Sequence, residues 1–111
     1  MTRAQLEAFA MGLPAVTKVI QWGESDVFKV GGKVFAISGD VSVSFKVTEI
    51  GFMALTESGV GRQAPHCAKG QWVAVDTAAA PHADLTSWLT TAHGMIAAKL
   101  TKKAHAELGL A

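Results

Sequence analysis

Two lysines beside a glycine pair are the residues best placed to do chemistry. Lys29 and Lys33 flank Gly31-Gly32, a dipeptide typical of the two-residue turn between antiparallel strands. Both side chains are therefore expected to project from one hairpin tip. An ammonium group at such a tip can neutralise a nucleic-acid phosphate and release a counterion. The pair is the strongest single candidate for a phosphate-binding site.

Other cations and two indole rings could extend this contact. The further candidate cations are Lys46, Arg62, Lys69, Lys99, Lys102 and Lys103. Trp22 and Trp72 could stack on unpaired bases, although tryptophans beside apolar strand residues commonly fill a core. Cations spread among nine acidic residues are also typical of an ordinary solvated surface. The sequence leaves both alternatives open.

A metal site has little support. His66, Cys67, His82 and Asp84 carry ligand atoms, but adjacent side chains such as His66 and Cys67 should point apart. No Cys-x-x-Cys or His-x-x-x-His spacing accompanies them. The carboxylates are too dispersed for hard cations, which prefer several oxygens. We expect no metal and no cofactor.

Catalysis has equally little support. Nucleophilic chemistry needs a nucleophile, a base and an orienting group held together. Cys67 and the histidines show no such local signature, and the helical pattern around His93 predicts that it lies at the surface. No glycine-rich phosphate loop is followed by Lys-Ser or Lys-Thr. We therefore expect a protein that is not an enzyme.

The first half of the chain is predicted to form one helix and a four-stranded meander. Thr2 and Gln5 have the spacing of a capping box, and Gly12 and Pro14 end the helix that follows. Period-two alternation then indicates strands. The expected elements are a helix over 3–11 and strands over 17–22, 27–30, 33–37 and 41–47.

The second half is predicted to add three helices and a strand. We expect a helix over 48–58, a loop over 61–70, a strand over 71–76, a long helix capped by Asp84 and a last helix over 102–108 capped by Thr101. This order favours an α+β fold: an antiparallel sheet of about five strands backed by helices on one face. Ser42, Ser44 and Lys46 predict a polar outer face, which could bind a protein or a small ligand instead of nucleic acid.

Three segments together resemble the MmcQ/YjbR family of small bacterial proteins. They are "LPAV…QWG…DVFKVGGKVFA" from Leu13 to Ala36, "GQWVAVD" from Gly70 to Asp76 and "LTSW…AAKLTKK" from Leu85 to Lys103. The resemblance implies a CyaY-like α+β fold and a DNA-binding role, which has been proposed from a double-wing arrangement. It supplies no catalytic or ligand residues. Thr101 stands where the family usually has proline.

Length and charge set the remaining expectations. The chain has 111 residues, half of them hydrophobic, which suits a single domain over residues 1–111. A net charge of +1 excludes nucleic-acid binding driven by a strong field of the whole molecule. One cysteine cannot form an internal disulfide, and no signal or membrane segment is evident. We expect a cytoplasmic monomer that binds DNA phosphates through its hairpin lysines.

Overall fold

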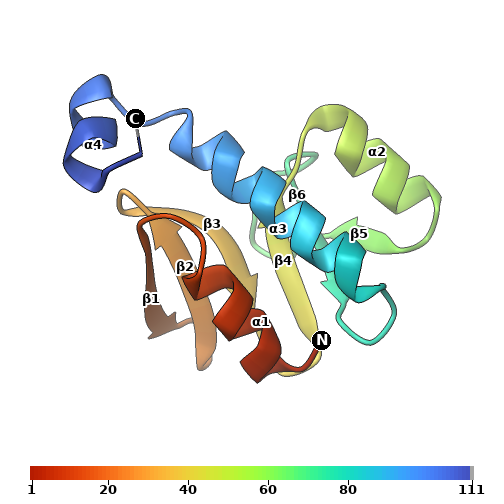
Figure 1. Cartoon of the computed structure of the whole chain (residues 1–111). Helices are drawn as coiled ribbons and strands as arrows, with labels where there is room; N and C mark the ends of the chain where they lie inside the picture. The colour runs from red at the N-terminus through yellow and green to blue at the C-terminus, as the bar shows by residue number, and fades with distance from the viewer. Residues whose placement is uncertain (111) are drawn as a thin grey trace.

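The protein folds as a six-stranded antiparallel sheet with four helices (Figure 1). The computed structural model describes residues 1–110. The strand order is β1-β2-β3-β4-β6-β5. The elements are α1 (Arg3–Met11), β1 (Val16–Gln21), β2 (Ser25–Val30), β3 (Lys33–Ser38), β4 (Ser42–Lys46), α2 (Glu49–Glu57), β5 (Gly61–Gln63), β6 (Trp72–Asp76), α3 (His82–Ala97) and α4 (Lys102–Leu108). The predicted α+β class is confirmed, with six strands where about five were expected.

The core lies between the sheet and the helices on one of its faces. α3 packs across β2, β3 and β4, α1 covers β1 and β2, and α2 contacts β5 and β6 (Figure 1). Phe28, Phe35 and Phe45 reach this layer from the central strands, and Leu85 and Leu89 meet them from α3; all five are fully buried. Burial of each such side chain stabilises the fold by about 1.5–3 kcal/mol. No helix of the described part of the chain covers the opposite face of the sheet.

Threonines begin three of the helices, as the sequence predicted for two of them. Thr2, Thr48 and Thr101 each accept a hydrogen bond from a backbone N–H in the first turn, and Thr2 with Gln5 completes a capping box. α3 differs, because Pro81 occupies its N-cap and Asp84 lies within the first turn. The prediction of Asp84 as the cap was wrong by one turn. At 16 residues α3 is the longest helix, and no helix in residues 1–110 is long and apolar enough to cross a bilayer.

β5 is the strand that the sequence did not predict. Its three residues were expected to belong to the loop over 61–70, but they pair with β6 from Gly61↔Val75 to Gln63↔Val73. A segment this short has no detectable alternation, and it forms only because β6 offers an unpaired edge. The pairing places the following loop beside the uncovered face of the sheet.

His93 is buried, where a surface position was expected. Its Nε2 lies 2.8 Å from the carbonyl oxygen of Pro14, and its ring meets Phe35 edge-on at 5.3 Å. The helical pattern placed His93 at the polar boundary of α3. The partner that satisfies it lies 79 residues earlier in the chain, so local periodicity could not reveal it.

A bulge interrupts β3 beside its start. Phe28 of β2 pairs with Ala36, whereas Lys29 pairs with Val34, so Phe35 has no residue opposite it. The extra residue resets the alternation of side chains along the strand. Val34 and Ile37, three residues apart, therefore both reach the uncovered face.

Candidate functional site

The two lysines predicted from the sequence lie at the β2–β3 hairpin. Gly31 and Gly32 have φ values of +58° and +79°, the backbone that a two-residue turn of this type requires. Lys33 is exposed and Lys29 is half-buried. Neither takes part in the ion pairs of the described residues. Neither ammonium group is therefore engaged by a carboxylate within residues 1–110, and both can contact an external anion.

The hairpin packs against the junction of α3 and α4, which carries further lysines. A Cβ on Gly31 would lie 2.6 Å from a methyl carbon of Leu100, so any larger residue there would require the Leu100 side chain to shift. Lys99 precedes Leu100 and Lys102 follows it closely, and both are exposed. Figure 1 shows the β2–β3 turn beside the end of α3 and the start of α4. We call this region the basic end; its residues are Lys29, Lys33, Lys99, Lys102 and Lys103.

Two other predicted cations are engaged within the protein. Lys46 is buried, contrary to the expected polar outer face, and its Nζ donates to Oε1 of Gln71. Burial, and to a lesser degree the charge of Lys99, lowers the pKa of Lys46. Arg62 forms an ion pair with Asp76 at 3.1 Å. Neither side chain is well placed for phosphate.

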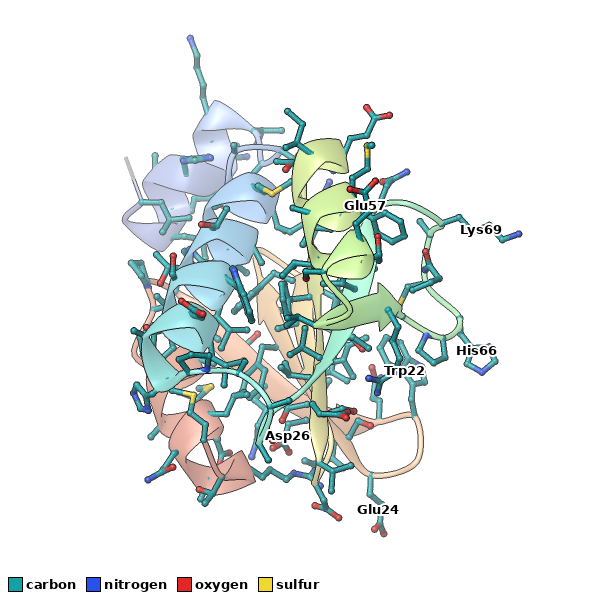
Figure 2. All side chains as sticks on the ribbon, turned by 90° about the vertical axis from the view of Figure 1, so that its right-hand side faces the viewer. Trp22, Glu24, Asp26, Glu57, His66 and Lys69 are labelled. Atoms are coloured by element: carbon teal, nitrogen blue, oxygen red, sulfur yellow. The ribbon has the colours of Figure 1, made fainter. Side chains whose placement is uncertain are left out.

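Lys103 and Lys69 stay exposed, but they lie on different elements. Lys103 is on α4, 3.9 Å from a carboxylate oxygen of Glu107, in an exposed pair of little strength. Lys69 is on the loop between β5 and β6 and points away from the body of the protein (Figure 2). Lys103 therefore belongs to the basic end, whereas Lys69 lies outside it.

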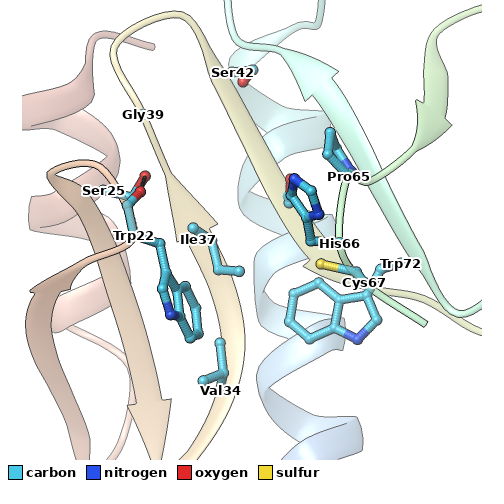
Figure 3. A pocket seen from close by; sticks show the side chains of 11 residues that line it. Trp22, Ser25, Val34, Ile37, Gly39, Ser42, Pro65, His66, Cys67 and Trp72 are labelled. Carbon is cyan, nitrogen blue, oxygen red and sulfur yellow. Dashed lines mark hydrogen bonds between the residues drawn. The ribbon is translucent and has the colours of Figure 1, made fainter.

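A cleft of about 690 Å³ opens on the uncovered face of the sheet (Figure 3). Its floor comes from β3 and β4, one wall from the turn between β1 and β2, and the other wall from β6 and the loop before it. The principal residues are Val34, Ile37, Ser42 and Ser44 of the floor, Trp22 of the first wall, and His66, Cys67 and Trp72 of the second. We call this the tryptophan cleft. Among the residues that the structure describes, no Lys, Arg, Asp or Glu lines it.

Both walls are held by unusual backbone. Trp22 has a φ of 51° and His66 a φ of 61°, in the left-handed region that bulky residues rarely adopt. Such a conformation costs on the order of 1–3 kcal/mol and persists only where its surroundings impose it. Figure 2 shows both side chains on the side of the sheet away from α1 and α3. Trp22 is 63% exposed, so it contributes little to the core.

Hydrogen bonds from neighbouring elements fix these two walls. Arg3 of α1 donates to the carbonyl oxygen of Glu24 in the turn that carries Trp22. Gln63 of β5 donates to the carbonyl oxygens of Ala64 and Cys67, and its Oε1 accepts from the N–H of Gly70 at 3.0 Å. Gln63 was not predictable from the sequence, because its role depends on the short strand β5, which periodicity does not reveal.

His66 and Cys67 both line the cleft, from adjacent positions in the loop before β6. Figure 3 shows the Cys67 sulfur beside the ring of Trp72, whereas the imidazole of His66, whose φ is 61°, extends away from that ring. No hydrogen bond joins His66 and Cys67 within the described residues, and burial raises the pKa of the Cys67 thiol. A raised pKa favours the neutral thiol over the nucleophilic thiolate.

Residues 1–110 contain no cluster of three or more histidine, cysteine or acidic side chains arranged to hold a metal ion. His82 and Asp84 lie at the start of α3, whereas His66 and Cys67 lie in the tryptophan cleft. The four candidate ligand residues therefore belong to two separate places.

The model of the YjbR family matches residues 11–95, which is well over half of the chain. The chain belongs to the YjbR family. No curated protein matches it. Among solved structures, a Deinococcus radiodurans protein with a DUF419 domain superposes with a TM-score of 0.88 at 24% identity, covering 99% of this chain and 89% of that one. A Pseudomonas syringae protein superposes with a TM-score of 0.74 at 18% sequence identity, and the match covers 86% of this chain and 99% of that one.

The structural neighbours establish the fold of this YjbR chain and say nothing of its activity. Their identities, 24% and 18%, are too low to carry individual site residues across. The family assignment agrees with the resemblance found in the sequence. The basic end and the tryptophan cleft must therefore be interpreted from their own chemistry.

Proposed function

We propose that this YjbR protein is a non-enzymatic nucleic-acid-binding protein that contacts phosphates through its basic end. The observation that carries the proposal is the packing of the Gly31 turn on Leu100, which gathers lysines of the hairpin and of the α3–α4 junction. Lys29 and Lys33 have no carboxylate partner among the described residues. A phosphate backbone presents the repeating negative charge that such a cluster attracts.

The positive charge of the basic end is local, so it is compatible with a chain whose net charge is only +1. The net charge of +1 conceals an uneven distribution, because Arg3, Lys18 and Arg62 are each paired with acidic groups. Within residues 1–110 the basic end contains a single ion pair, that of Lys103 with Glu107. Attraction for a polyanion therefore concentrates at one end of the molecule.

Fluorescence anisotropy with labelled DNA at 50 and 200 mM salt tests this proposal. Each phosphate contact on a duplex contributes about 0.9 to the slope of log K against log salt. The double variant Lys29→Gln/Lys33→Gln should therefore reduce that slope by about 1.8 and weaken binding. The matched control is Arg62→Gln, which removes a cation already paired with Asp76. Absence of binding at 50 mM salt, or equal binding by the double variant, would contradict the proposal.

A second candidate function is a small-ligand-binding module, and the tryptophan cleft favours it. At about 690 Å³ the cleft lies within the range of roughly 300–1,000 Å³ typical of ligand sites. An uncharged aromatic ligand that co-purifies with the protein, without any affinity for DNA, would support this candidate over the first.

We propose that the protein acts as a cytoplasmic monomer. Its single cysteine suits a reducing compartment, and nucleic-acid contact through one basic end needs no second copy. Size-exclusion chromatography with light scattering should give a mass near 11.6 kDa. A mass near twice that value would contradict the monomer.

A further inference from the structure

The tryptophan cleft has the chemistry of a site for a flat, uncharged ring. Two indoles face it from opposite walls, and the side chains of Val34 and Ile37 form an apolar floor (Figure 3). Aromatic rings bind other rings by stacking, with little dependence on their identity. The absence of charged residues among those lining the cleft excludes it as a phosphate site.

Polar groups at the floor and wall could recognise the edge of such a ring. Ser42 and Ser44 place hydroxyl groups in the cleft, and His66 adds an imidazole. Within residues 1–110 none of these three side chains makes a hydrogen bond in the structure. Each can therefore donate to or accept from a ligand without breaking an internal bond.

The stability of the fold does not explain why a tryptophan stands at position 22. Its left-handed backbone disfavours tryptophan, and its ring remains 63% exposed. Ser25 donates to the carbonyl oxygen of Trp22 at 3.2 Å, and Arg3 donates to that of Glu24, so the turn is fixed from two sides. A strained, exposed and firmly positioned ring indicates a role in binding.

One end of the cleft borders Lys29 of the hairpin. Val34 lies directly opposite Lys29 in the sheet, so the two share the uncovered face, whereas Lys33 lies opposite the core residue Val30 and points to the other face. The other end, near Gly39 and Ser42, lies beside Asp40 and Asp76. A ligand with an uncharged ring and a phosphate therefore matches the cleft in one orientation, with its phosphate toward Lys29.

We propose that the tryptophan cleft binds an unpaired base of a single-stranded nucleic acid, whose flanking phosphate lies toward Lys29. This inference rests on the proposed function and adds its substrate class. Bases of a duplex are stacked on one another and cannot enter such a cleft unless they leave the stack. The protein should therefore prefer single strands to duplexes.

Binding of a labelled dT12 strand and of a 12-base-pair duplex tests the inference, together with quenching of tryptophan fluorescence. Trp22→Gly removes the ring and relieves the backbone, so urea unfolding should show no loss of stability. It should weaken dT12 binding about tenfold, the effect of losing one stacking contact, and reduce quenching, while duplex affinity stays unchanged. Ile50→Ala is the matched control, because Ile50 is exposed on α2 outside the cleft.

The outcomes separate the inference from the function on which it rests. If dT12 and the duplex bind equally and Trp22→Gly alters neither, the inference fails and the proposed function stands. If neither DNA binds, both fail, and quenching by free thymidine alone would then assign the cleft to a small ligand. The variant Ser44→Asp leaves the Trp22 turn unchanged and adds a carboxylate to the cleft, which should repel the phosphates and weaken dT12 binding about tenfold, as for Trp22→Gly. If Ser44→Asp binds dT12 with unchanged affinity, the inference is contradicted.

Discussion

At the scale of single residues, Asp26 is the most buried acidic group of the fold. Its side chain is 6% exposed and accepts two hydrogen bonds of 3.1 Å from the guanidinium of Arg3, with Lys18 at 4.0 Å. The hydrogen bonds from Arg3 hold the pKa of Asp26 below its ordinary value, against the smaller opposing effect of burial. Arg3 also fixes the Trp22 turn, so this pair links α1 to the cleft.

The lowered pKa predicts how stability depends on pH. A carboxyl whose folded-state pKa is depressed contributes stability above its unfolded pKa and loses that contribution as pH falls through the folded pKa. Asp26→Asn should therefore lower the free energy of unfolding at pH 7 by about 2 kcal/mol. The variant should also show a smaller decrease in that free energy than the unmodified protein as the pH falls from 5 to 2. Urea unfolding across this range measures both effects.

Asp40→Asn is the control for this prediction. Asp40 also accepts from Arg3, at 2.8 Å, but its side chain is 85% exposed, so its loss should cost much less. Equal effects of the two substitutions would show that the burial of Asp26 is unimportant.

Residue-level prediction from the sequence succeeded where local chemistry decides the structure. The glycine pair located the hairpin that carries Lys29 and Lys33, because positive φ values are demanded by the turn itself. It failed for Lys46 and His93, whose partners, Gln71 and Pro14, lie 25 and 79 residues away in the chain.

At the scale of elements, the β2–β3 hairpin depends on its contact with the α3–α4 junction. Gly31 and Gly32 share a positive φ but differ in surroundings. A Cβ at Gly31 would collide with Leu100, whereas nothing lies within 4 Å of one at Gly32. The contact is what joins the hairpin lysines to those near α4.

Two matched substitutions separate backbone strain from this contact. Gly32→Ala should cost about 1 kcal/mol, because it adds only the strain of a positive φ. Gly31→Ala should cost more, since Leu100 must also move, and it should weaken DNA binding by separating the two groups of lysines. Thermal unfolding and anisotropy measure the two effects; equal stability and affinity in both variants would argue against the contact.

Element boundaries were predictable where caps mark them. The helices over 3–11 and 102–108 begin after threonines whose hydroxyl groups satisfy the first turn, and the structure has the same bounds. β5 was not predictable, because three residues become a strand only when the edge of β6 is present.

At the scale of the whole molecule, the two candidate surfaces differ in how firmly the fold holds them. The tryptophan cleft lies on the central strands, whereas part of the basic end lies on α4, which has no buried residue. The cleft itself was beyond sequence analysis, because Trp22, Ser44 and Cys67 come from three segments that only the folded sheet brings together.

Hydrogen exchange should report this difference. We expect the amides of α4 to exchange faster than those of β3 and β4, because few apolar contacts oppose local opening. Single-stranded DNA should slow exchange in α4 and in the β2–β3 turn. α2 is the internal control: it also has no buried residue and lies away from the basic end, so its exchange should not change. Slowing confined to α2 would contradict the proposed surface.

The bulge at Phe35 has a consequence for comparing YjbR chains. One inserted residue lets Val34 and Ile37 share a face, so a chain lacking that insertion would turn Val34 inward and truncate the floor beside Lys29. Counting residues between the glycine pair and Gly39 would then sort relatives into those with a full-length groove and those with a shortened one. The spacing offers a simple criterion for choosing which relatives to assay.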